Sequence, residues 1–116
     1  MRFLVDEDVL SVLDVFTARH SVRSSVDVFG SGALDPVIRQ YLVAQPEPEI
    51  LITGDNDFAK KCRQLGSRLP CLWLHDLHDL DLARVTELLE VIEREAELLG
   101  PMFFMEIRAG SYHVQR

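Results

Sequence analysis

The stretch ILITGDNDF at residues 50–58 leads from a short apolar run directly into a turn with two aspartates. Short uninterrupted apolar runs rich in β-branched residues are typical of strands that are buried on both faces, as in parallel sheets. The amino-terminal stretch RFLVDED at residues 2–8 repeats this pattern, because its apolar residues also end abruptly in acids. We therefore expect two buried parallel strands, Arg2–Val5 and Ile50–Thr53, each with carboxylates at its carboxyl end.

Helical and extended patterns alternate along the rest of the chain. The predicted elements, in order, are a helix from Val9 to His20, a half-buried strand near a sheet edge from Ser21 to Phe29, a helix from Asp35 to Ala44, a helix from Phe58 to Leu65, a strand from Leu69 to Leu74, a helix from Asp81 to Leu99 and a β-hairpin from Phe103 to Val114. This order predicts an α/β fold: a single three-layer αβα domain over residues 1–116, with a mostly parallel central sheet and a C-terminal β-hairpin.

Aspartates stand at the predicted helix starts, where a side-chain carboxylate can cap free backbone amides. Asp35 is followed by proline, which is well tolerated in the first helical turn. The other candidate caps are Asp57, Asp8 or Ser11, and Asp81. Capping alone would account for some of these acids.

The composition is that of one folded domain with an acidic surface. The chain has 116 residues, of which 47% are apolar, a formal charge of −7 and a pI near 4.9. This charge argues against a broad basic surface for non-specific binding of nucleic acid, although a metal-binding acidic site would contribute to it. No segment has the pattern of a signal peptide or a membrane span, so we expect a cytoplasmic protein. Cys62 and Cys71 are expected to be reduced, buried thiols.

Four aspartates are expected to meet at one edge of the predicted sheet. Asp6, Asp55 and Asp57 follow parallel strands, whose carboxyl ends lie at the same edge, and Asp35 begins a helix that points there as well. Clustered carboxylates repel one another, so they either have raised pKa values or bind a hard cation such as Mg²⁺ or Mn²⁺. Two separate buried strands that both end in acids favour a metal site over capping alone.

Three stretches together resemble the PIN-domain superfamily, and most closely its short, VapC-like branch. They are RFLVDED at residues 2–8, DPVI at residues 35–38 and ILITGDNDF at residues 50–58, within a matching region that runs from Met1 to about Leu77. The last stretch is the most specific of the three. The resemblance implies a PIN-like fold and a Mg²⁺- or Mn²⁺-dependent endoribonuclease, often the toxin of a bacterial toxin-antitoxin pair, that cuts phosphodiesters of RNA.

The resemblance also implies a role for each matching side chain. Asp6, Asp55 and Asp57 would hold the metal, and Asp35 would be the helix-borne catalytic acid beside them. Thr53 would orient a carboxylate or a metal-bound water through its hydroxyl. The ion would lower the pKa of a water molecule and neutralise charge that grows on the phosphate.

The chain departs from the full-length family pattern after the first helix. Full-length PIN nucleases carry a further acid on an additional helical segment, and residues 21–34 leave no room for that segment. Asp8 and Asp27 are the acids that could replace it, at positions that do not match the family's.

Basic side chains near the predicted edge are few. Lys60 and Lys61, the only lysines, lie with Arg63 on the predicted helix that follows Asp55. They are the candidate contacts to the phosphates of an RNA substrate. A run of charge on a helix is also typical of a solvated face.

Two other functions fit the same chain. A PIN-like protein without activity would be a partner-binding module, whose helix from Asp81 to Leu99 and hairpin with Phe103, Phe104 and Met105 would pack on an antitoxin or on a second copy. A phosphoacceptor receiver domain also has acids after its first strand and an aspartate after its third. Its chemistry needs a lysine at the end of a late strand, where this chain has none.

Overall fold

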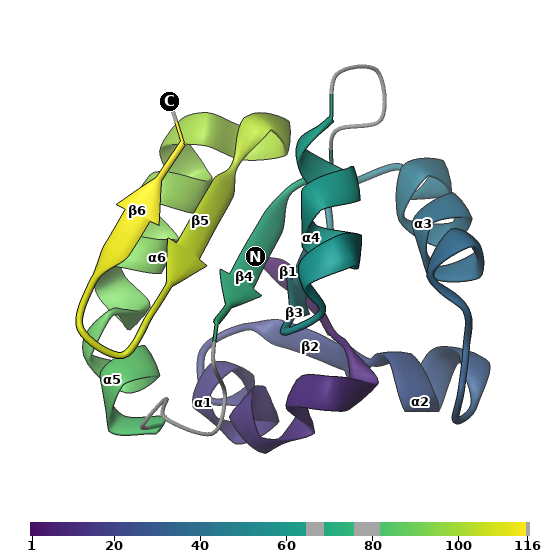
Figure 1. Ribbon diagram of the computed structural model, residues 1–116, viewed down its shortest axis with the longest axis horizontal. Helices are drawn as coiled ribbons and strands as arrows, with labels where there is room; N and C mark the ends of the chain where they lie inside the picture. Colours follow the sequence, from purple (N-terminus) through teal and green to yellow (C-terminus); the bar gives the residue numbers. More distant parts are fainter. Residues whose placement is uncertain (65–68, 76–81, 116) are drawn as a thin grey trace.

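The protein has an α/β fold built on one six-stranded sheet, as a computed structural model that describes residues 1–64, 69–75 and 82–115 shows (Figure 1). The strand order is β2-β1-β3-β4-β5-β6, and every neighbouring pair is parallel except β5 and β6, which form the C-terminal hairpin. The predicted fold class is therefore confirmed. The strands are β1 (Arg2–Val5), β2 (Ser21–Ser24), β3 (Ile50–Thr53), β4 (Cys71–Leu74), β5 (Phe104–Ile107) and β6 (Tyr112–Val114).

Helices cover both faces of the sheet (Figure 1). Residues of α1, α5 and α6 pack on one face, and residues of α3 and α4 pack on the other. None of the helices in the described part of the chain is long and apolar enough to cross a membrane. The helices are η1 (Glu7–Val12, 3₁₀), α1 (Leu13–Thr17), α2 (Ser25–Phe29), α3 (Asp35–Ala44), α4 (Asn56–Arg63), α5 (Leu82–Glu87), α6 (Leu89–Leu99) and η2 (Gly100–Met102, 3₁₀).

The two cores explain why the central strands are apolar without interruption. Successive side chains of a strand point to opposite faces of the sheet. In β1, Phe3 and Val5 enter the core under α1, α5 and α6, whereas Leu4 enters the core under α3 and α4. In β3, Ile52 and Leu51 divide in the same way. A strand between two helical layers has no polar face, so its sequence does not alternate.

The second half of the predicted strand from Ser21 to Phe29 is wrong, because residues 25–29 form the short helix α2. The hydroxyl of Ser24 accepts a hydrogen bond of 3.0 Å from the Asp27 amide and so caps this turn. Gly30, with φ of 83°, ends it. This part of the chain therefore holds a helix of five residues where we expected a continuous strand.

The first helix also differs from its prediction. It begins at Glu7 with the 3₁₀ turn η1, which has a non-helical residue at Val9, and the α-helix proper covers only Leu13–Thr17. The cap is neither Asp8 nor Ser11. The carboxylate of Asp6 accepts a hydrogen bond from the Glu7 amide, so the strand-end acid itself starts the turn.

The predicted N-caps of two further helices are wrong. The N-cap of α3 is Leu34, whose carbonyl accepts the first helical hydrogen bond, so Asp35 is already the first residue of the helix and does not cap it. The N-cap of α4 is Asp55 and not Asp57. The helix α3 begins at Asp35 as predicted, whereas α4 begins at Asn56, two residues before its predicted start at Phe58.

The predicted helix from Asp81 to Leu99 is divided into α5 and α6 at Leu88. The apolar spacing continues across this break, so the sequence pattern does not reveal it. The expected cap Asp81 and the expected helix end at Leu65 lie outside the described residues.

The apolar side chains of the predicted partner-binding hairpin and both cysteines belong to the two cores. Phe103, Phe104 and Met105 are buried, so they do not form an exposed face for a partner. Cys62 and Cys71 are free, buried thiols, as predicted. Burial raises the pKa of the Cys71 thiol.

A buried ion pair joins the edge strand β2 to the residue that precedes β3. Nη2 of Arg23 lies 2.7 Å from Oε1 and 2.8 Å from Oε2 of Glu49, whose side chain is only 1% exposed. A carboxylate at this depth is costly unless a cation and hydrogen bonds compensate for its desolvation. Arg23 therefore compensates for the burial of the Glu49 carboxylate directly before β3.

We expect Arg23→Ala to lower the free energy of unfolding by about 3 kcal/mol, because it leaves the Glu49 carboxylate buried without its cation. Arg2→Ala is the matched control. Arg2 lies 3.8 Å from Glu47 in a pair whose side chains are 33% and 74% exposed, and its loss should cost less than about 1 kcal/mol. Urea denaturation measures both variants, and equal losses would contradict the role of the buried pair.

Candidate functional site

A buried hydrogen bond joins the carboxyl ends of β1 and β3. Val5 and Ile52 are register partners, and the Asp6 amide donates to the Ile52 carbonyl at 2.9 Å, so the two strands end side by side. At this edge the hydroxyl of Thr53 donates to Oδ2 of Asp6 at 2.9 Å. Thr53 is fully buried and Asp6 is 9% exposed. The contact therefore holds one oxygen of the Asp6 carboxylate in a defined direction.

The same hydroxyl places the second strand-end acid. Its oxygen accepts a hydrogen bond of 3.1 Å from the Asp55 amide. Oδ1 of Asp55 in turn accepts from the Phe58 amide at 3.0 Å and caps α4. Backbone contacts thus hold Asp55 at the start of the helix that covers β3 and β4.

Asp8 joins these acids. The sequence made it a candidate only as a replacement for the acid that full-length PIN nucleases carry on an additional segment. The η1 turn brings its carboxylate to the Gly54 amide, at a long contact of 3.4 Å. Desolvation, strengthened by the negative charges of Asp6 and Asp55, raises the pKa of Asp8 to about 6. A further signal in the sequence is its position three residues after the end of β1, where a tight turn can fold a side chain back over the edge.

Asp35 also lies within reach of the strand-end acids. Desolvation is the largest cause of a raised pKa at Asp35, and the charges of Asp55, Asp6 and Asp57 raise this pKa further. The positive charge of Lys61 opposes the rise. The helix α3 therefore delivers its first residue to the edge at which β1 and β3 end, as expected.

The predicted site residues of α4 differ in their relation to the acids. Asp57, Lys60 and Lys61 are all exposed, and the charges of Asp57 and Lys61 act on Asp35. Nothing in the described part of the chain links Lys60 to the acids. Arg63, the third basic residue of the helix, pairs with Glu106 at 3.3 Å. Of the two lysines, Lys61 is thus the one whose charge acts on an acid of this edge.

Glu7 ties the loop before α3 to this edge. Its Oε2 accepts a hydrogen bond of 2.7 Å from the Ser31 hydroxyl, and its Oε1 accepts one of 2.9 Å from the Gly32 amide. These bonds lower the pKa of Glu7. Gly32 has φ of 80°, a conformation that favours glycine. Glu7 therefore steadies the segment that leads into Asp35.

The donor set suits a hydrated divalent cation. Within the described residues, no three His, Cys, Asp or Glu side chains form a ready-made group that could hold a metal ion. Mg²⁺ is commonly bound through one or two carboxylates and completes its octahedron with water and substrate phosphate oxygens. Asp6 and Asp55, with Asp8 beside them, supply carboxylates of that kind. Their chemistry fits Mg²⁺ or Mn²⁺ in an open site and does not provide an all-protein cage.

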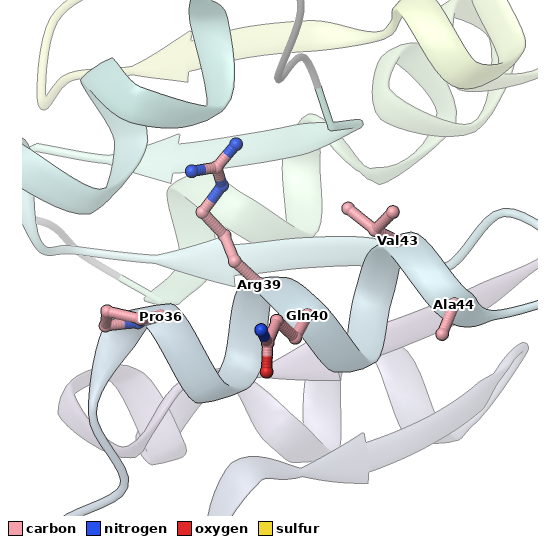
Figure 2. Close-up of a pocket in the computed structure, with 5 residues that line it drawn as sticks. All are labelled: Pro36, Arg39, Gln40, Val43 and Ala44. Carbon is pink, nitrogen blue, oxygen red and sulfur yellow. The ribbon is translucent and has the colours of Figure 1, made fainter.

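A separate hollow of about 420 Å³ lies along α3 (Figure 2). Its walls are mostly apolar, and none of the acids lines it. It is lined by Pro36, Arg39, Gln40, Val43 and Ala44. Its lining residues run from Pro36, in the first turn of α3, to Ala44 at the end of this helix.

We expect Asp8→Asn to stabilise the metal-free protein at pH 7.5. The folded state keeps the Asp8 proton up to a pH near 6, whereas the ordinary pKa is 3.8, so stability is lost as the pH rises through this window. Allowing for solvent screening at this exposed residue, the gain should be about 1 kcal/mol at pH 7.5 and mostly gone near pH 4. Urea denaturation in chelator at both pH values measures it.

The control for this change is Asp14→Asn, at an exposed position on α1. Its effect should not follow the same pH window. A gain in Asp8→Asn that is the same at both pH values would contradict the desolvation of this carboxylate.

We expect Thr53→Val to lower the free energy of unfolding by about 2 kcal/mol, because it leaves Asp6 and the Asp55 amide without a shared partner in a buried place. Thr53→Ser keeps the hydroxyl and removes one methyl group, which should cost about 1 kcal/mol. Chemical denaturation of both variants gives the comparison. A smaller loss for valine than for serine would show that packing, and not the hydroxyl, matters at this position.

No protein-family model matches the chain, and comparisons with curated proteins and with solved structures gave no match either. Four carboxylates, linked by their charges, lie at one edge of the parallel sheet: Asp6, Asp8, Asp35 and Asp55.

Proposed function

We propose that this chain is a metal-dependent endoribonuclease that uses Mg²⁺ or Mn²⁺ at the acidic edge of its sheet. The observation that carries the proposal is the buried hydrogen bond from Thr53 to the Asp6 carboxylate, because the same hydroxyl accepts from the Asp55 amide and so links the two strand-end residues. Asp6 and Asp55 each cap a helix, and the contact with Thr53 is one that capping does not require. The raised pKa of Asp8, caused by desolvation and by Asp6 and Asp55, supports a shared site.

The side chains divide into those that hold the ion and those that position them. Asp6 and Asp55 are the proposed ligands, with Asp8 beside them. Asp57 is exposed on α4 and is the weaker candidate. Thr53 positions both strand-end acids. When bound, the cation supplies charge neutralisation at the phosphate and lowers the pKa of a water molecule.

RNA as the substrate is supported by the resemblance to PIN domains and by the local charge. The whole chain carries a formal charge of −7, so a polyanion needs cations at the site itself. Lys61, whose charge acts on Asp35, and the neighbouring Lys60 are the proposed contacts to the phosphates. The role of toxin in a toxin-antitoxin pair rests on the resemblance alone.

An inactive partner-binding module is the second candidate, and one observation favours it. Leu34, Val37 and Val43 on or next to α3 are 70%, 48% and 65% exposed. With the hollow in Figure 2, they give this helix an apolar outer side. A surface of this kind suits a protein partner, either an antitoxin or a second copy.

A phosphoacceptor receiver domain is disfavoured by the lysines. Both lysines of the chain lie on α4, which begins directly after Asp55. Asp55 also uses one carboxylate oxygen to cap that helix. The chain therefore lacks the late-strand lysine that phosphoacceptor chemistry needs.

We expect the wild type to bind Mn²⁺ in calorimetry and to cleave single-stranded RNA only when the metal is present. The double variant Asp6→Asn, Asp55→Asn should lose both, with cleavage reduced more than about a hundredfold, because it removes the proposed ligands. The matched control is Asp14→Asn, Glu97→Gln, which removes two exposed acids on α1 and α6, neither of which is a candidate for the site. Urea denaturation shows whether each variant is folded.

Failure of the wild type to bind Mn²⁺ at millimolar concentration would refute the nuclease mechanism. The partner-binding module would then be the better proposal. Sedimentation of the wild type and of Val43→Asp would test it, since a self-associating face on α3 should dissociate in the variant.

A further inference from the structure

Asn56 lies between Asp55 and Asp57, and the indole of Trp73 holds its side chain. Nε1 of Trp73 donates a hydrogen bond of 3.1 Å to Oδ1 of Asn56. An indole N–H can only donate, so the amide oxygen must face it and the Nδ2 group must be turned away. Asn56 is exposed, whereas Trp73 is 4% exposed. A buried ring therefore sets the orientation of a surface amide.

The ring that orients Asn56 is itself tightly packed. Trp73 stacks on His75 with ring centroids 3.7 Å apart and an interplanar angle of 29°, and it meets the edge of Phe104 at 6.3 Å. It is also the register partner of Thr53, the residue whose hydroxyl holds Asp6 and Asp55. The side-chain amide of Asn56 is thus held by a residue that lies beside Thr53, which in turn contacts Asp6 and Asp55.

Nδ2 of Asn56 makes no hydrogen bond within the described part of the chain. It brings two neutral N–H donors to an edge that otherwise carries carboxylates. A lysine at this position would pair with Asp55 or Asp57 and would compete with a metal ion for them. An amide can donate to an anion and leaves the charge of the carboxylates unchanged.

We propose that Asn56 is a substrate-contacting residue whose Nδ2 donates to a non-bridging phosphate oxygen of RNA, with Trp73 as the positioning residue behind it. This inference rests on the proposed ribonuclease function and names one contact of that site. A donor of set direction at the phosphate fits the need to hold a polyanion beside acids.

A purely structural role of Asn56 is the competing explanation. Buried indole N–H groups usually have a hydrogen-bond partner, and Asn56 supplies one. Under that explanation the loss of Asn56 costs stability and leaves cleavage by the folded protein unchanged. Under our proposal it lowers kcat/KM of the folded protein and leaves Mn²⁺ binding intact.

The test is a double-mutant cycle of Asn56→Ala and Trp73→Phe, with Mn²⁺ affinity, unfolding free energy and kcat/KM measured for each protein. The probe is a fluorescein-labelled single-stranded RNA of mixed sequence, cleaved in Mn²⁺. We expect Asn56→Ala to lower kcat/KM about tenfold or more, since it removes a hydrogen bond to a charged group, while Mn²⁺ affinity stays unchanged. Trp73→Phe should lower kcat/KM less and should reduce the effect of Asn56→Ala.

A phosphorothioate RNA adds a readout that a structural role would not move. Sulfur at a contacted non-bridging oxygen should slow the wild type, and this slowing should diminish in Asn56→Ala. The Trp73→Phe background keeps the test decisive if Asn56→Ala alone is unstable, because no indole N–H is then left unpaired.

Each outcome separates the two proposals. If the wild type binds Mn²⁺ and cleaves RNA while kcat/KM and the sulfur effect are the same without Asn56, the contact is refuted and the ribonuclease function stands. If the wild type neither binds Mn²⁺ nor cleaves RNA, both proposals fail together.

Discussion

The hydroxyl of Thr53 is the contact on which the acidic edge depends. It donates to Asp6, which precedes it by 47 residues, and it accepts from the amide of Asp55, which follows it by two. Thr53 is fully buried and Asp6 is 9% exposed, so the hydroxyl and the carboxylate would each be costly without the other. Threonine suits the position because its β-branched side chain favours a strand and its hydroxyl can both donate and accept a hydrogen bond.

The arrangement of the cores explains why the acids collect where they do. Apolar side chains fill both faces of β1 and β3 up to Val5 and Ile52, so the next polar positions are Asp6, just after β1, and Thr53, the last residue of β3. Parallel pairing then brings these positions to one edge. The raised pKa of Asp8 and of Asp35 shows that the fold tolerates like charges close together. Such tolerance of a locally unfavourable arrangement is common at functional sites.

The predictability of the fold follows from how local each signal is. The strands β1 and β3 can be predicted from the sequence because both of their faces are buried, so their apolar runs are not interrupted by polar residues. The segment that became α2 is only five residues long, and Val26 and Val28 fit a strand as well as a helical turn until the cap by Ser24 decides. The break at Leu88 has no such local mark, since apolar residues continue at helical spacing on both sides.

The residues of the candidate site also differ in whether the sequence could predict them. Asp6 and Asp55 follow from strand ends, which are local features. The part played by Asp8 depends on a 3₁₀ turn that folds it back to Gly54, a residue 46 positions away. The hydrogen bond between Trp73 and Asn56 likewise joins residues on different elements. Contacts between segments that are distant in sequence leave no periodic trace, so only the folded chain reveals them.

The position of β3 between β1 and β4 has a consequence for the order of events during synthesis. The segment that precedes β3, residues 1–49, contains β1 and β2 but not Thr53, so a growing polypeptide at that stage holds Asp6 without its partner. The acidic edge is assembled only when β3 has left the ribosome and inserted beside β1. If the edge cleaves RNA, the enzyme stays harmless to the ribosome and message that are making it until that insertion takes place.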